Sequence, residues 1–260
     1  MVTGKQAGAL DAQPLVLIAD TAHGPRIEAV NRAGAAAGAH KGMMLADART
    51  LCPEIATAPS DPAGDLGFLE TLAIWAQRWG PWSALDPPDG LLVDVTAVAH
   101  LFGGENRLLA DVQQAFVQRQ LAVRTAIAPT AGAAWALAHH GREGAIVEGD
   151  KAIERALSDL PVAALRLDQD VVTVLRRLGL KRLGEIATLG RDAIQRRFRN
   201  RKSPAANPLV RLDQLLGRVP EPLLPVVPQQ VPLVQRRLLE PIRHRQLLDT
   251  VVTDLAGDMA

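Results

Sequence analysis

The chain has 260 residues, of which 48% are hydrophobic, and a formal net charge of +1 at pH 7. This composition excludes a disordered polyelectrolyte, and no apolar run approaches the roughly 18 residues that a membrane-spanning helix needs. The length predicts about two domains. The single cysteine, Cys52, excludes an internal disulfide and predicts a reducing, cytoplasmic location.

The small net charge hides two regions of opposite sign. Residues 44–111 hold ten acids and three arginines, a balance of −7, whereas residues 166–202 hold eleven bases and four acids, a balance of +7. A basic region of this density is typical of phosphate binding, although charge segregation also occurs on proteins that only need to stay in solution.

Strand-like and helical segments alternate over the first 158 residues. Apolar and β-branched residues predict strands at 14–19, 26–30, 90–96 and 121–128. Apolar residues at helical spacing predict helices at 65–79, 106–118 and 131–139. Together these segments predict an α+β domain in which helices cover a sheet.

Beyond Pro161 the pattern becomes helical and predicts a second, small domain that ends near Gly217. Three glycines separate its short basic helices: Gly179, Gly184 and Gly190. The proline-rich segment 221–232 predicts an extended linker. After it we expect a strand over 231–242 and a helix over 244–260, which is too little chain for a third domain.

The stretch DPPDGLLVDVT at 86–96 is a turn that leads into a strand with a carboxylate in its middle. Strand alternation places Asp89 and Asp94 on opposite faces, so these two acids alone do not make a two-metal site. A carboxylate inside an apolar strand is nevertheless unusual, because burying a charge costs free energy unless the charge is paired or bound to a metal. A structural turn and the remains of a metal site are both open interpretations.

Three other motifs favour structural roles. His139 and His140 have no third ligand at metal-binding spacing, so we interpret them as helix-end residues. The three tryptophans of WAQRWGPW (75–82) favour core packing over base stacking. The segment LFGGE (101–105) precedes a helix whose N-terminus can bind an anion, but a helix start explains it equally well.

The basic segment LRRLGLKRLGEIATL (175–189) predicts two short helices joined around Gly179 and Gly184. Four cations lie beside this turn: Arg176, Arg177, Lys181 and Arg182. Such a helix-hairpin-helix unit can present backbone N–H groups and cations to a DNA phosphate without reading bases. A helical hairpin with a solvated basic face is the other interpretation.

Taken in order, these segments resemble a known family. The chain is similar to the fingers, palm and thumb of Y-family, UmuC-type DNA polymerases in AVNRAGAAAGAHKGMMLADARTLCPEIATAPSD, GPWSALDPPDGLLVDVT, VRTAIAPTAGAAWALA and LRRLGLKRLGEIATL. Within that family, the combination of PDGLLVDVT, HLFGGE, AAWALA and LPVAALRLD resembles the ImuB branch of polymerase-like mutagenesis proteins.

The resemblance implies a division of the chain. Residues 1–158 would form a partial palm sheet with a fingers insertion at about 20–60, and residues 159–220 a helical thumb that is helix-hairpin-helix-like. The linker at 221–232 would precede the start of a little-finger domain at 233–260. The family's first palm strand, which carries a catalytic aspartate, would lie upstream of Leu15, so we expect a chain truncated at both ends.

The resemblance also implies that the catalytic chemistry is lost. Active members hold two magnesium ions with an acidic pair just before the Leu-Asp-Val-Thr strand. Here Asp89 keeps the first acid, but Gly90 stands where the glutamate should be, and a hydrogen atom can neither bind a metal nor act as a base. Asp89 and Asp94 are therefore expected to be vestigial, with no catalytic residue, no metal and no cofactor.

Other family positions depart as well. The tyrosine and arginine that contact the nucleotide triphosphate are replaced by Arg32 and Ala35, which leaves Arg32 as a vestigial nucleotide contact. Pro129-Thr130-Ala131 and Trp135 replace a Pro-Asn-Lys segment and a further lysine. Leu165-Arg166-Leu167 replaces a glycine-hydrophobic-glycine phosphate nest in the thumb.

By resemblance, the expected function is a non-catalytic scaffold in DNA-damage-induced (SOS) mutagenesis and translesion synthesis, in the cytoplasm at the nucleoid. Expected partners are DNA, bound without sequence preference, the sliding clamp, a RecA-like protein and an error-prone replicative-type polymerase. The expected DNA contacts are Arg176, Arg177, Gly179, Lys181, Arg182, Gly184, Arg196, Arg197 and Arg199. The segment QVPL (230–233) faintly resembles a clamp-binding peptide, but it lacks an aromatic anchor and is not expected to be one.

Two alternative functions stay open. An active error-prone Y-family DNA polymerase would use Asp89, Asp94 and an upstream aspartate with magnesium. A structural adaptor would keep the fold and never touch DNA.

Overall fold

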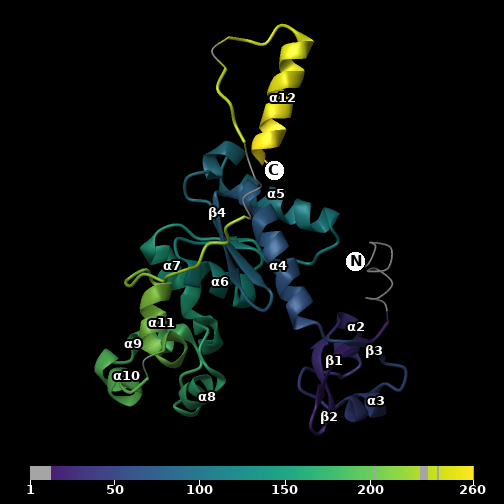
Figure 1. Ribbon diagram of the computed structural model, residues 1–260. Coiled ribbons are helices and arrows are strands. Elements are labelled where there is room, and N and C mark those ends of the chain that lie inside the picture. Colours follow the sequence, from purple (N-terminus) through teal and green to yellow (C-terminus); the bar gives the residue numbers. More distant parts are fainter. Residues whose placement is uncertain (1–12, 202, 229–233, 239, 260) are drawn as a thin grey trace. The chain divides into compact units, whose positions relative to one another are not determined.

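The computed structural model describes residues 13–201, 203–228, 234–238 and 240–259. Their contacts divide the chain into two units, the first ending at Pro225 and the second beginning at Val226. In the first unit, helices and strands alternate as far as β7 (Ala145–Ile146) and only helices follow among the described residues (Figure 1), which confirms the predicted α+β class. None of the described helices combines the length and the apolar character that crossing a membrane requires.

The first sheet contains β1 (Leu15–Thr21), β2 (Gly24–Val30) and β3 (Ala56–Pro59) in the order β2-β1-β3. Strand β1 pairs antiparallel with β2 and parallel with β3. The short helices α2 (Arg32–Ala36) and α3 (Leu45–Leu51) accompany this sheet. Its core is built around Val16 on β1 and Ile27 on β2, both fully buried.

A hairpin and two longer helices follow. Helix α4 (Pro62–Ala76) continues into the 3₁₀ turn η1 (Gln77–Trp79), and β4 (Trp82–Asp86) pairs antiparallel with β5 (Gly90–Asp94). The 3₁₀ turn η2 (Ala99–Phe102) then precedes α5 (Glu105–Gln118). The ring of buried Trp79 contacts Trp75 and Phe116 at centroid distances of 4.7 and 6.2 Å, which confirms the core-packing interpretation for these two tryptophans.

The next segment holds α6 (Ala131–His140), α7 (Asp150–Ser158) and two short parallel strands, β6 (Ala126–Ile127) and β7 (Ala145–Ile146). The strand predicted over 121–128 is therefore wrong except at Ala126–Ile127. The guanidinium of Arg124 donates to the carbonyls of Ala138 at 2.6 Å and Gly141 at 2.7 Å. Residues before β6 thus pack against the carboxyl end of α6 instead of pairing with another strand.

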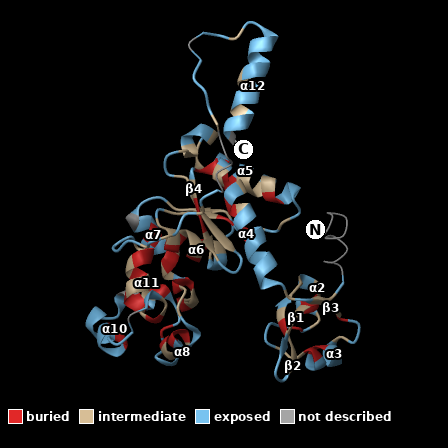
Figure 2. Ribbon diagram, viewed as in Figure 1, coloured by how far each residue is buried: buried red, intermediate tan, exposed pale blue. Residues whose placement is uncertain are grey.

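The helical pattern predicted beyond Pro161 is confirmed. The structure has η3 (Val162–Leu165), α8 (Gln169–Arg177), α9 (Leu183–Thr188), α10 (Arg191–Phe198), η4 (Pro204–Ala206) and α11 (Pro208–Leu215). Buried residues of these elements form one core with α6 and α7, seen as red segments in Figure 2. Leu165, Leu175 and Ile186 are among its most deeply buried side chains.

The second unit contains α12 (Arg245–Met259), which confirms the helix predicted over 244–260 for its described part. The strand predicted over 231–242 is wrong for 234–238 and 240–242, where no strand partner is present among the described residues. Instead, Arg236 forms ion pairs with Asp254 at 2.8 Å and Asp258 at 3.2 Å on α12. Residues 231–233 and 239, and the QVPL segment at 230–233, lie outside the described residues.

Candidate nucleic-acid interface

The predicted basic hairpin is present, with its turn at a single glycine. Helix α8 ends at Arg177, and Gly179 has φ of +84°, a left-handed conformation that glycine adopts without a Cβ clash. Gly184 does not join the helices, because it lies inside α9. A Cβ there would come within 3.2 Å of the Ser158 carbonyl oxygen, so Gly184 allows close packing rather than a turn.

The backbone N–H groups expected to face a phosphate already have an internal partner. The N–H groups of Lys181 and Arg182 donate to Oε2 of Glu185 at 2.5 and 2.9 Å. Both bonds hold the pKa of Glu185 below its ordinary value, and the bond from Arg182 has the larger effect. A glutamate three residues after the N-cap residue is a sequence signal for such a capping interaction, and Glu185 stands in that position relative to Arg182. The prediction of free backbone N–H groups did not take this signal into account. Side chains, rather than these N–H groups, are therefore what the turn presents to an anionic partner.

All seven predicted cations are exposed, and six of them form no ion pair with any described residue. Buried Ile194 and Phe198 fix α10 against the core, so the arginines of that helix point to solvent. The seventh cation, Arg182, pairs with Asp159 at 2.9 Å. The six unpaired cations are Arg176, Arg177, Lys181, Arg196, Arg197 and Arg199.

Other bases of the same region are neutralised within the fold. Arg191 pairs with Asp213 at 2.6 Å, and Arg201 pairs with Asp170 at 2.8 Å. Arg166 is largely buried and points away from solvent, with 14% of its side chain exposed. The excess of positive charge counted in the sequence is therefore concentrated, on the surface, at α8, α10 and the turn between α8 and α9.

Of the two acids of the β4–β5 hairpin, Asp89 lies in the turn, as predicted, whereas Asp94 does not lie in the middle of a strand. Asp89 is exposed in the turn between β4 and β5, and Asp94 is the exposed last residue of β5. The expectation of a carboxylate inside an apolar strand is wrong, because neither acid is buried. The Thr96 hydroxyl and the Thr96 N–H, which lies 3.0 Å from Asp94 Oδ1, hold the pKa of Asp94 below its ordinary value.

A third acid, Asp86, lies next to Gly90, the position at which the resemblance expects a metal-binding glutamate. Asp86 pairs with Gly90 across the hairpin, and its Oδ1 accepts a hydrogen bond from Arg166 at 3.1 Å. A Cβ at Gly90 would lie 3.0 Å from the Asp86 carbonyl oxygen and 3.2 Å from Oδ2. No three His, Cys, Asp or Glu side chains gather as a metal-binding group anywhere in the described part of the chain. The described residues therefore do not fit the pair of magnesium ions that active members of the resembled family hold.

The remaining candidates take simple structural positions. Arg32 is exposed at the first position of α2, and its nucleotide contact stays a prediction. His139 and His140 end α6, as expected, and the His139 ring stacks on Trp135 at 3.9 Å. Glu105 begins α5, so its own carboxylate stands at the helix N-terminus that was considered for an anion. Burial, and then the charge of Glu148, raise the pKa of Glu105.

Comparison with known proteins identifies the family of this chain. Residues 3–139 match the impB/mucB/samB family over more than half of the chain. The chain belongs to this family. It is 39% identical over 217 residues to the protein ImuB of two Caulobacter vibrioides strains, NA1000 / CB15N and ATCC 19089, a match that covers 84% of this chain and 46% of the relative. This impB/mucB/samB-family chain thus spans about half the length of the curated relatives it matches.

Solved structures confirm the predicted polymerase fold. DinB from Sulfolobus solfataricus superimposes with a TM-score of 0.65 and 16% identity, over 83% of this chain and 63% of that one. An insertion ternary complex of Dbh DNA polymerase gives a TM-score of 0.67 at 16% identity, over 84% and 65% of the two chains. The impB/mucB/samB-family chain therefore has the fold of a Y-family polymerase-like protein.

Proposed function

We propose that this chain is a non-catalytic, polymerase-like DNA-binding protein that acts at the nucleoid in damage-induced (SOS) mutagenesis and translesion synthesis. The observation that carries the proposal is the set of six exposed, unpaired cations on α8, α10 and the intervening turn. Phosphates along a DNA backbone are the partner that such a cation cluster fits, and contacts of this kind carry no base information. The expected affinity is therefore salt-dependent and insensitive to sequence.

The hairpin supports the non-catalytic half of the proposal. Phosphoryl transfer needs clustered oxygen ligands that seat divalent cations beside the reacting phosphate. Asp89 is exposed in the turn before β5, Asp94 is exposed at the last position of β5, and Asp86 is bound to Arg166. We accordingly propose that the chain uses no metal and no cofactor.

The proposed partners are the sliding clamp, a RecA-like protein and an error-prone replicative-type polymerase, which the chain would bridge to DNA. This part rests on the resemblance to the ImuB branch and on the 39% identity to ImuB. Co-purification of each partner with the chain, in its full natural length and after DNA damage, is the corresponding measurement. Absence of all three would remove the bridging role and leave DNA binding to be judged separately.

DNA binding is tested by replacing the cations at the α8–α9 turn with serine. We expect the variant that lacks Arg176, Arg177, Lys181 and Arg182 to lose most of its retention on immobilised double-stranded DNA at low salt. Circular dichroism would verify that the helices persist. Retention equal to that of the unaltered chain would instead support the adaptor that never touches DNA.

Polymerase activity is the second candidate function, and the fold similarity to Dbh DNA polymerase is the observation that favours it. Primer extension with magnesium or manganese ions separates the two proposals. We expect no template-dependent nucleotide addition. Addition that Asp89→Ala abolishes would overturn the non-catalytic proposal.

A further inference from the structure

Four charged side chains from distant parts of the first unit meet below its surface. Asp86 ends β4, Arg166 follows η3, Arg211 lies on α11, and Glu221 follows that helix. Their exposed side-chain fractions are 25, 14, 18 and 10%, so all four are largely desolvated. Two positive and two negative charges leave this buried ion cluster neutral, which is the condition under which charges are tolerated inside a protein.

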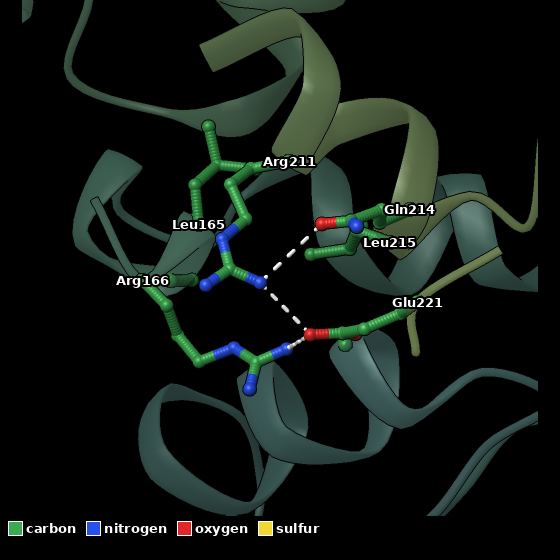
Figure 3. A pocket seen from close by; sticks show the side chains of 8 residues that line it. Leu165, Arg166, Arg211, Gln214, Leu215 and Glu221 are labelled. Atoms are coloured by element: carbon green, nitrogen blue, oxygen red, sulfur yellow. Dashed lines mark hydrogen bonds and ion pairs between the residues drawn. The ribbon is translucent and has the colours of Figure 1, made fainter. Parts of the chain in front are cut away.

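Arg166 is the residue that connects the cluster. Its Nη1 donates to Oδ1 of Asp86 at 3.1 Å, and its Nη2 donates to Oε1 of Glu221. Arg211 donates to the same Glu221 oxygen at 2.8 Å (Figure 3). Arg166 has φ of +53°, a conformation that a residue with a Cβ adopts at a cost, and its guanidinium lies 5.4 Å from the Trp135 ring centroid. Its inward orientation is therefore held by several specific contacts.

The hollow beside these side chains is too small for a ligand. It is lined by residues of η3, α6 and α11 together with Glu221, and its volume is about 10 Å³, roughly the space for one water molecule. A nucleotide or a phosphate group does not fit there. The cluster is thus a structural connection rather than a binding pocket.

The chain after α11 continues along the hairpin. Beyond Glu221, Pro225 forms an antiparallel bridge with Ala84 on β4. The first part of the segment predicted as an extended linker is therefore attached at two points, through Glu221 in the cluster and through Pro225 at the strand. Gly90 lies opposite Asp86, where any Cβ would approach both the carbonyl oxygen and the carboxylate of Asp86.

From these contacts we propose that the buried ion cluster fastens residues 221–225 to the β4–β5 hairpin, and that Gly90 is required for the cluster to close. Arg166 is then a positioning residue and not a DNA contact, although it belongs to the most basic region of the sequence. The glycine at position 90 has a packing function of its own, apart from the missing metal-binding acid. The connection to the second unit begins at Pro225 rather than at the end of α11.

Amide hydrogen exchange on the whole chain, followed by mass spectrometry, tests the proposal. In Arg166→Gln we expect amides of the two paired hairpin strands, β4 and β5, to exchange at least tenfold faster, because Asp86 and Glu221 lose a shared cation. Amides in the buried parts of α8 and α11 should keep their rates. The matched control is Arg201→Gln, which breaks the exposed ion pair with Asp170 and should change neither segment.

Gly90→Ala provides an independent second test of the same cluster. It should accelerate exchange in β4 and β5 by a similar factor, and the double variant with Arg166→Gln should exchange no faster than the faster single variant. If Arg166→Gln fails to fold, Glu221→Gln, which keeps the side-chain shape and one acceptor, should show the same local acceleration. Unchanged rates in β4 and β5, equal effects of the Arg201 control, or multiplied effects in the double variant would each overturn the proposal.

A DNA measurement separates this inference from the proposed function. Arg166→Gln should leave the salt dependence of DNA binding unchanged, since the side chain is turned inward. A smaller salt dependence would make Arg166 a phosphate ligand and contradict its positioning role. A chain that binds no DNA at all would remove the proposed function while the exchange experiment still decides on the cluster.

Discussion

Removal of Arg196 and Arg199 should weaken the salt dependence of DNA binding in a calculable way. The two residues are three positions apart at the end of α10, so their side chains are neighbours on one exposed surface. Neither forms an ion pair with a described residue. The double variant Arg196→Ser/Arg199→Ser therefore removes two cations that are free to meet adjacent phosphates.

The size of the effect follows from counterion release. Each neutralised phosphate of double-stranded DNA contributes about 0.9 to the slope of log affinity against log salt, so two contacts contribute about 1.8. Between about 50 and 200 mM salt, a fourfold increase, these two contacts alone account for a roughly 12-fold loss of affinity. The variant should bind more weakly at low salt, and its affinity should fall roughly 12-fold less over this range.

Fluorescence anisotropy of a labelled duplex, titrated at four salt concentrations, measures both slopes. The control is Arg191→Ser/Arg201→Ser, which changes the net charge by the same amount in the same helical region. Arg191 and Arg201 are already paired with Asp213 and Asp170, so their removal should leave the slope nearly unchanged. The control separates a specific surface from overall charge.

Two results would refute this reasoning. Equal reductions of the slope in both double variants would mean that total charge, and not the unpaired arginines, governs binding. An unchanged slope in Arg196→Ser/Arg199→Ser, together with retained affinity, would mean that α10 does not face DNA.

The remaining predictions concern single side chains. Because burial raises the pKa of Glu105, its charge destabilises the fold increasingly as pH rises above the ordinary value of about 4.3; Glu105→Gln should raise the melting temperature at pH 7, and the gain should vanish near pH 4. Thr96→Val removes the hydroxyl bond and should therefore raise the pKa of Asp94 toward its ordinary value in a carboxyl NMR titration. The stability that this bond adds is present above about pH 4 and disappears as pH falls through the lowered pKa. An unshifted titration would contradict the assignment. Ser83 is fully buried and donates to the Ala73 carbonyl at 2.9 Å, so Ser83→Ala should cost about 1–3 kcal/mol in denaturant unfolding, and a neutral substitution would contradict this.

Elements with strong local patterns were predictable from the sequence. The strands around Val16 and Ile27 and the helices α4, α5 and α6 follow from apolar spacing, since each pattern is complete within a few residues. The strand predicted at 121–128 failed because Arg124 finds its partners at the end of α6, which the local pattern does not contain. Strand propensity describes a side chain's fit to a neighbouring strand, and only the fold supplies that neighbour.

The candidate interface, too, was predictable from the sequence only in part. The sequence placed the basic residues and the turn at Gly179, but it counted Arg166, Arg191 and Arg196 as equivalent cations. Arg166 lies in a buried cluster with partners 80 and 55 positions away in the chain, whereas Arg191 is paired at the surface. Only Arg196, of these three, is free to attract a phosphate.

The sequence alone thus determined the α+β class, the order of the motifs and the family resemblance, and that resemblance predicts that Gly90 replaces an acid. The tertiary structure decided which charges remain uncompensated and which acids can approach one another. The physical reason is that a charge acts on a partner molecule only to the extent that the protein has not neutralised it, and the neutralising groups come from residues far away in the sequence.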